Sequence, residues 1–164
     1  MAITRILVPI DFSPDSLHAV TYGGDLAKRL GAELVILHVV DQTYLAGTRE
    51  LYFANPEFAK ILDEQWRIAN AQLDRAGADL QKHGHRCRTL VQRGVPAQVI
   101  VDTAKDEGTD LIVMGTHGRT GLAHMLIGSV AERVVRSAHC PVLTLRRAAR
   151  RAPRKARRSH QRLR

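Results

Sequence analysis

The sequence predicts an α/β fold, an open doubly wound sheet of mostly parallel strands with helices on both faces. Segments with strand character alternate with segments of helical periodicity five times along the 164 residues, and this alternation is typical of parallel sheets joined by right-handed crossovers. The first candidate strand, residues 5–10, is apolar on both faces, as expected where helices cover each side of a sheet. The length suits one domain with its own core.

Asp11 ends the first strand, and the first helix is expected to begin just after it. Ser13 is a favourable N-cap, Pro14 suits the first helical position, and Asp15 puts a carboxylate in the first turn. The helix should run to about Leu30. Asp11 has two interpretations, because a carboxylate just past the carboxyl end of a parallel strand either contacts a ligand or caps the turn.

The first helix should pack on the sheet through residues at helical spacing. These are Leu17, Val20, Gly24, Ala27 and Leu30. Two consecutive glycines, Gly23 and Gly24, are costly inside a helix and therefore predict close packing at that point. Gly31 is a suitable stop.

The second strand is predicted at residues 33–40, and we interpret His38 within it as a core or edge histidine. Residues 41–55 show no clear period and are long for a connection, so they are a candidate flap beside a site. A long helix should follow from Pro56 to about Lys82, with an apolar stripe against the sheet. The stripe consists of Leu62, Trp66, Ala69, Leu73, Ala76 and Leu80.

His83 and His85 end the long helix. A His-x-His pair suits a metal ion, but no third ligand is near in the sequence, so a metal site is disfavoured. The alternating residues 86–92 predict a third strand. A further helix should begin near Pro96 and end at Gly108.

The stretch between the fourth strand, residues 110–114, and the last helix is rich in glycine. Gly115, Gly118 and Gly128, followed by Ser129, form the pattern Gly-x2-Gly-x9-Gly-Ser. Glycine allows a sharp turn or a close approach to a ligand, and the helix that opens at Ser129 offers unpaired N–H groups that suit phosphate. The stretch is neither a Walker loop nor a dinucleotide GxGxxG motif, and its position alone favours ordinary turn glycines. The fifth strand is expected at residues 141–145.

This glycine pattern resembles the nucleotide-binding signature of the universal stress protein family, a UspA-like domain, in its ATP-binding branch. The resemblance extends from Ile-Leu-Val-Pro-Ile-Asp-Phe-Ser at residues 6–13 to Cys-Pro-Val-Leu at residues 140–143. It implies a Rossmann-like, five-stranded parallel sheet in the order 3-2-1-4-5. In that order the topological switch point lies between the ends of strands 1 and 4, where such sheets bind ligands. Asp11 and Gly115 should therefore flank one crevice.

The resemblance also implies which residues of this chain bind a nucleotide. The nucleoside side would be formed by Pro9, Ile10 and Asp11, the base contact by Val39 or Val40, and the floor by Met114 and Gly115. Backbone N–H groups for the phosphates would come from Gly118, Gly128, Ser129 and Val130. His117 and Arg119 are further candidates for the phosphate side, and Mg²⁺ bridging the phosphates is compatible with such a site.

The implied function is that of a stress protein which binds ATP or a related adenine nucleotide and responds through its conformation or assembly. The sequence keeps every position of the glycine signature, which places it with the binding relatives. No catalytic residue is predicted, because there is neither a positioned base nor a Walker lysine. We therefore expect at most slow ATP hydrolysis, and the scattered histidines disfavour a metal-dependent hydrolase.

The net charge of +9 is confined to the carboxyl terminus. Residues 146–164 hold ten Lys and Arg and no Asp or Glu, which leaves 15 basic and 16 acidic residues before them. We expect a near-neutral universal stress protein domain at residues 1–146 and a disordered basic tail at residues 147–164. The tail is a candidate for nonspecific binding of nucleic acid or another polyanion, and the alternative is a solvated tail without a role.

The sequence begins directly with a strand and shows no signal peptide and no long apolar span. We therefore expect a cytoplasmic protein without membrane association. The resemblance implies homodimers through the last strand, Val142 to Leu145, and a strand at the edge of a sheet offers such a surface.

Overall fold

A computed structural model describes residues 2–43, 56–116 and 127–146 of the chain. Five strands form one sheet in the order β3-β2-β1-β4-β5, and every neighbouring pair is parallel. The strands are β1 (Arg5–Ile10), β2 (Glu33–Asp41), β3 (Cys87–Gly94), β4 (Leu111–Gly115) and β5 (Val142–Leu145). The predicted fold class and strand order are therefore confirmed.

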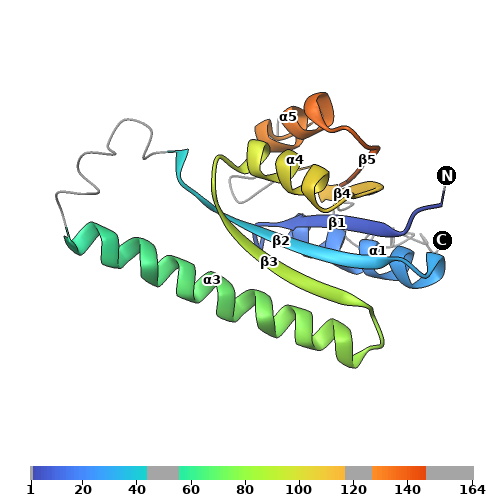
Figure 1. Cartoon of the computed structure of the whole chain (residues 1–164), viewed down its shortest axis with the longest axis horizontal. Coiled ribbons are helices and arrows are strands. Elements are labelled where there is room, and N and C mark those ends of the chain that lie inside the picture. The colour runs from blue at the N-terminus through green and yellow to red at the C-terminus, as the bar shows by residue number, and fades with distance from the viewer. Residues whose placement is uncertain (1, 44–55, 117–126, 147–164) are drawn as a thin grey trace, which may run out of the picture.

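Helices cover both faces of the sheet (Figure 1). The helices are α1 (Pro14–Leu30), α3 (Pro56–Lys82), α4 (Pro96–Asp106) and α5 (Ser129–Ser137). One buried cluster joins the sheet to α1 and α3, and a second joins its opposite face to α4 and α5. None of the helices in the described part of the chain is both long enough and apolar enough to cross a membrane.

Helix α1 has the predicted caps, but its buried face differs from the predicted one. The Ser13 Oγ accepts the N–H of Ser16 at 3.2 Å, and Gly31 adopts a left-handed φ of 68°. Leu17 and Leu30 are each 47% exposed, so their prediction as sheet-facing residues is wrong. The buried face consists of Ser16, Ala19, Val20, Gly23, Gly24 and Ala27.

The two glycines of α1 explain this small-residue face. A Cβ on Gly23 would lie 2.8 Å from the Val8 Cγ2, and one on Gly24 would lie 3.3 Å from the His85 Cε1. Helix α1 therefore lies so close to its neighbours that leucine side chains do not fit beneath it, and the close packing predicted from the glycine pair is confirmed.

Helix α3 buries the predicted stripe, with Leu62, Ala69 and Leu73 inside the protein. Trp66 is half-buried and carries the guanidinium carbon of Arg93 4.6 Å from its ring centroid. Arg93 also pairs with Asp63 at 3.1 Å. Trp66 therefore joins the start of α3 to the end of β3, as well as filling space.

An ion-pair network closes the amino edge of the sheet. Glu33 accepts from the Arg5 Nε at 2.9 Å and from the Arg88 Nε at 3.1 Å, and Arg88 also pairs with Glu107. At the start of β4, Asp110 accepts the backbone N–H groups of Thr4 and Arg5 at 2.7 and 3.0 Å. The network ties together the beginnings of four strands.

These contacts lower the pKa of three carboxyls. The hydrogen bond from Arg88 lowers the pKa of Glu107, and the backbone N–H of Thr4 does the same for Asp110. Burial alone would raise the pKa of Glu33, but Arg5 and Arg88 together outweigh it and lower the pKa. Because the folded pKa values lie below those of the unfolded chain, the stabilisation is present above about pH 4.5 and is lost as the pH falls through the folded values.

We expect Glu33→Gln to reduce the free energy of unfolding at pH 7 by roughly 0.5–1 kcal/mol, the value for a partly screened pair. The variant should also lose less stability than the parent protein between pH 5 and pH 3. Thermal unfolding across this pH range measures both effects. Glu132→Gln, which removes the exposed pair with Arg136 on α5, is the matched control and should change neither. Parallel curves for the parent protein and Glu33→Gln would contradict the prediction.

Candidate functional site at the carboxyl edge of the sheet

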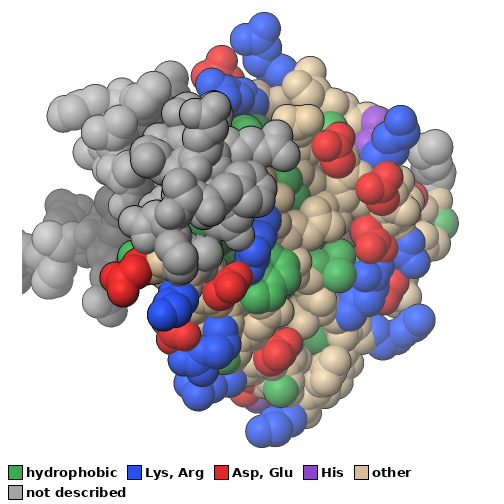
Figure 2. Space-filling view, turned by 60° about the vertical axis from the view of Figure 1, so that its left-hand side comes forward, with side chains coloured by type: hydrophobic (Ala, Val, Ile, Leu, Met, Phe, Trp, Pro, Cys, Tyr) green, Lys and Arg blue, Asp and Glu red, His purple; other side chains and the backbone are tan. Residues whose placement is uncertain are grey.

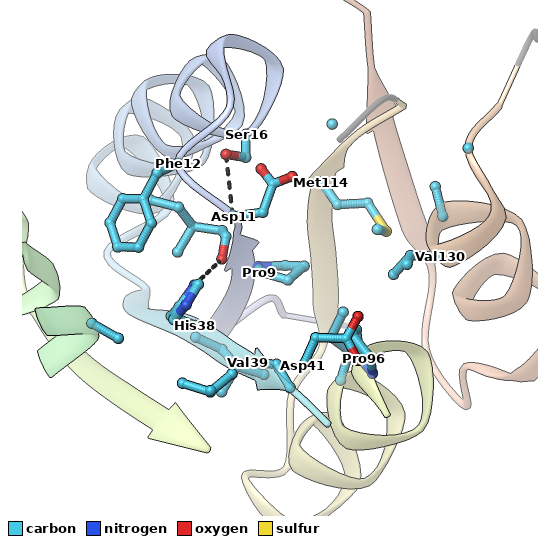
Figure 3. Close-up of a pocket in the computed structure, with 18 of the residues that line it drawn as sticks. Pro9, Asp11, Phe12, Ser16, His38, Val39, Asp41, Pro96, Met114 and Val130 are labelled. Atoms are coloured by element: carbon cyan, nitrogen blue, oxygen red, sulfur yellow. Dashed lines mark hydrogen bonds between the residues drawn. The ribbon is translucent and has the colours of Figure 1, made fainter. Parts of the chain in front are cut away.

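A cavity of about 720 Å³ opens at the carboxyl edge of the sheet (Figure 3). It lies between the ends of β1 and β4, where the strand order reverses direction, and it also reaches β2 and the helices α3, α4 and α5. Doubly wound sheets bind their ligands at this point, and the volume is typical of small-molecule sites.

All of the predicted nucleotide-binding residues that the structure describes line this one cavity. They are Pro9, Ile10, Asp11, Val39, Val40, Met114, Gly115, Gly128, Ser129 and Val130. The remaining candidates, His117, Gly118 and Arg119, fall outside the described residues, and their contact with a nucleotide stays a prediction.

Asp11 caps the turn after β1 and lines the cavity at the same time. Its Oδ1 accepts the N–H of Ser13 at 3.0 Å, while its own N–H donates to the Ser16 Oγ at 3.3 Å. Between these residues Phe12 adopts a φ of 63°, which is uncommon for a residue other than glycine. The capping interpretation of Asp11 is therefore confirmed, and its contact with a ligand stays a prediction.

Phe12 and His38 form an aromatic pair beside Asp11 (Figure 3). Their ring centroids are 4.8 Å apart at an angle of 45°. The His38 Nδ1 lies 2.7 Å from the carbonyl oxygen of Ile10, so Nδ1 carries the hydrogen and donates it, which fixes the ring. His38 is buried as predicted, but it also lines the cavity, and Phe12 was not among the predicted site residues.

The first turn of α5 presents backbone N–H groups at the cavity. Gly128 is the N-cap, and the first intrahelical bond runs from the Glu132 N–H to the Gly128 carbonyl at 2.9 Å. The N–H groups of Ser129, Val130 and Ala131 precede that bond. Gly128 differs from the prediction, because its N–H donates to the Thr116 carbonyl at 2.7 Å and thereby ties together the two ends of the glycine-rich stretch.

The packing of β4 on α1 requires a residue without a side chain at position 115. A Cβ at this position would lie 2.9 Å from the carbonyl carbon of Asp15 and 3.0 Å from its Cβ. The end of β4 therefore packs directly on the first turn of α1. The absence of a side chain at Gly115 is needed for this packing, whether or not a ligand also approaches.

Among the described residues that line the cavity, Asp11 and Asp41 are acidic and none is Lys or Arg. Over the described surface in Figure 2, basic and acidic side chains lie interspersed. A bound phosphate would therefore depend on the N–H groups of α5 and the positive end of its helix dipole. Any cation must come with the ligand or from residues outside the described part. Within the described part, no group of three His, Cys, Asp or Glu residues is arranged to hold a metal ion.

The fold and the cavity define a doubly wound α/β protein with a cavity at its topological switch point, where proteins of this class bind their ligands. The sequence model of the universal stress protein family matches residues 2–146. Universal stress protein YxiE of Bacillus subtilis is 35% identical over 147 residues, covering 87% of this chain and 98% of the relative. A universal stress protein of Methanocaldococcus jannaschii is 35% identical over 151 residues, covering 87% and 82%. The chain therefore belongs to the universal stress protein family.

Solved structures of relatives share the fold. UspA from Lactobacillus plantarum superposes with a TM-score of 0.79 at 28% identity, covering 89% of this chain and 99% of that one. A universal stress protein in complex with cAMP superposes with a TM-score of 0.64 at 25% identity, covering 88% and 98%. At least one structural relative therefore holds an adenine nucleotide.

Proposed function

We propose that this protein binds ATP or a related adenine nucleotide in the cavity at the carboxyl edge. We further propose that it acts in the stress response through a nucleotide-dependent conformation or assembly. The observation that carries the proposal is that the end of β1 and the first turn of α5 line the same cavity. More than a hundred residues separate these two segments in the sequence. The relative in complex with cAMP and the intact glycine signature of the ATP-binding branch support it.

In this proposal the base lies against Val39 and Val40, and the ribose lies near Asp11. The phosphates accept the N–H groups of Ser129 and Val130, where the α5 dipole favours negative charge. Because the described lining carries acidic and no basic side chains, we propose that Mg²⁺ accompanies the nucleotide and is held mainly by phosphate oxygens.

We propose binding with at most slow hydrolysis. Phosphoryl transfer needs a residue that positions the attacking water and cationic groups that neutralise the transition state. Asp11 is the carboxylate nearest the proposed ribose, and its Oδ1 already accepts the N–H of Ser13. None of the described lining residues supplies a Lys or Arg.

The test is to heat-denature protein purified without added nucleotide and to identify the released small molecules by mass spectrometry. We expect about one adenine nucleotide per chain. Protein freed of nucleotide should gain about 5 °C or more in its unfolding midpoint when ATP is present at about 100 times its Kd. An empty protein that gains no thermal stability with ATP would show that the proposed site does not bind it.

We also propose a homodimer through β5, which is an edge strand of the sheet and whose four residues are half-buried in the single chain. Light scattering with and without ATP, on the same samples, reports whether the assembly exists and responds to nucleotide.

The basic tail at residues 147–164 lies outside the described residues. Its association with nucleic acid stays a prediction, measurable as salt-dependent retention that is lost when the chain ends at Leu145.

A further inference from the structure

The strand that leads into the basic tail ends beside the wall of the cavity. β5 pairs with β4, and Leu145 is in register with Gly115, while neighbouring strands lie about 4.8 Å apart. The Thr116 N–H donates to the Leu145 carbonyl at 2.9 Å, and both Gly115 and Thr116 line the cavity. The chain therefore leaves the sheet, after Leu145, one strand spacing from the cavity wall.

This side of the cavity is the one to which the proposed function assigns the phosphates. The Thr116 carbonyl accepts the Gly128 N–H at 2.7 Å, and Gly128 is the N-cap of α5, whose first turn carries the N–H groups of Ser129 and Val130. The base is assigned to the end of β2, which lies on the opposite side of β1 in the strand order. The exit of the chain from β5 is therefore close to the phosphate end of the proposed site and away from its base end.

The described lining of the cavity lacks the positive charge that a polyphosphate attracts. It contains Asp11 and Asp41 and neither Lys nor Arg. A bound triphosphate would add several negative charges beside these two carboxylates. Lys and Arg commonly hold phosphate oxygens, and a guanidinium binds them through two parallel hydrogen bonds. Cations supplied from beyond the described lining would therefore stabilise the bound nucleotide.

The tail carries such cations within reach of the phosphate end. Residues 147–164, which lie outside the described residues, hold nine Lys and Arg and no Asp or Glu. Arg150 and Arg151 follow Leu145 by five and six residues, and a flexible segment of that length spans roughly 12–14 Å on average. Because the tail is tethered beside the cavity, its effective concentration there is on the order of millimolar.

We propose that the basic tail of this chain binds the phosphates of a nucleotide held in the cavity and so completes the phosphate end of the site. This inference rests on the proposed function, since the bound phosphates are the group that the tail recognises. The nucleotide draws the tail to the carboxyl edge of the sheet, and the tail in turn raises the affinity for the nucleotide. By thermodynamic linkage the two effects have the same magnitude.

The experiment is calorimetric titration of three proteins, each freed of nucleotide, with ATP and with adenosine. They are the parent chain, a variant of the same length in which the nine Lys and Arg residues of the tail are replaced by Gln, and a chain that stops after Arg146. We expect both altered proteins to bind ATP about tenfold more weakly than the parent, which corresponds to the loss of one hydrogen bond between charged groups. Adenosine has no phosphate and should bind all three proteins equally.

Ionic strength and a free peptide supply two further measurements. Between about 50 and 300 mM NaCl, the affinity of the parent protein for ATP should fall more steeply than that of the Gln variant, because salt screens contacts made by exposed charges. A synthetic peptide of residues 147–164 is the control and should bind ATP far more weakly than the whole protein. A peptide that binds ATP as tightly as the parent protein would show that the tail acts without the cavity, and the inference would be wrong.

The outcomes separate this inference from the proposed function. If all three proteins bind ATP equally tightly, the tail does not contact the phosphates, while the proposed function stands. Loss of nucleic-acid retention in these same proteins would then assign the tail to nucleic acid instead. If the altered proteins bind adenosine as weakly as they bind ATP, the tail supports the fold and the inference is wrong. If ATP binds to none of the three, the proposed function fails and this inference fails with it.

Discussion

Replacing Gly128 by valine is expected to abolish nucleotide binding and to leave the fold intact. Gly128 has φ −73° and ψ 155°, an extended conformation open to any residue, so the backbone does not require glycine. The residue nevertheless lines the cavity at the first turn of α5. An isopropyl group would occupy space that the phosphates need to reach the N–H groups of Ser129 and Val130. Loss of one or two hydrogen bonds to a charged group corresponds to about 3 kcal/mol, or roughly 100-fold in Kd.

This prediction is measured by nucleotide release from purified protein and by the ATP-induced shift in the unfolding midpoint. Ser137→Val, at the exposed opposite end of α5, is the control. This variant should still release bound nucleotide and should still show the ATP-induced shift in the unfolding midpoint. The midpoint without nucleotide should be similar for the two variants, which separates a blocked site from a damaged fold. Gly128→Val protein that still carries nucleotide would show that the phosphates do not approach this turn.

The order of the helices and strands along the chain could be predicted from the sequence, because hydrophobic periodicity and capping residues act over only a few neighbouring residues. Ser13 and Gly31 cap α1 as predicted, since each capping contact spans only a few residues. The sheet-facing side of α1 was assigned partly wrongly, because spacing alone does not tell how near a helix comes to the sheet. Gly23 and Gly24 carried that information, since residues without side chains allow an approach that excludes Leu17 and Leu30 from the interface.

The cavity was predictable only in part. The carboxyl ends of β1 and β4 meet because of strand order, so the joint lining by Asp11 and Gly115 follows from topology. Gln65 and Ile68 gave no comparable signal, because they lie outside the apolar stripe of α3 and reach the cavity only through its packing on the sheet. The bond from the Gly128 N–H to Thr116 likewise depends on how the ends of the glycine-rich stretch come together.

Replacing Gly115 by alanine should destabilise the protein even when no nucleotide is present. The new Cβ would lie 2.9 Å from the carbonyl carbon of Asp15 and 3.1 Å from its oxygen, and these are backbone atoms that cannot rotate away. The first turn of α1 would have to move, and overpacking of this kind costs about 1–3 kcal/mol. For a chain of this size the unfolding midpoint should fall by roughly 3–10 °C.

Gly128→Ala is the matched control, since it adds the same methyl group to another glycine of the same signature. Its extended backbone accommodates alanine. The loss of freedom in the unfolded chain stabilises the variant, while alanine is a poorer N-cap than glycine, so the two effects should largely offset each other and leave the stability close to that of the parent protein. Equal midpoints for Gly115→Ala and Gly128→Ala, measured without nucleotide, would contradict the packing argument. A difference in the expected direction would separate the two glycines physically, because it would show that the fold itself requires glycine at position 115, where β4 contacts α1, and not at position 128.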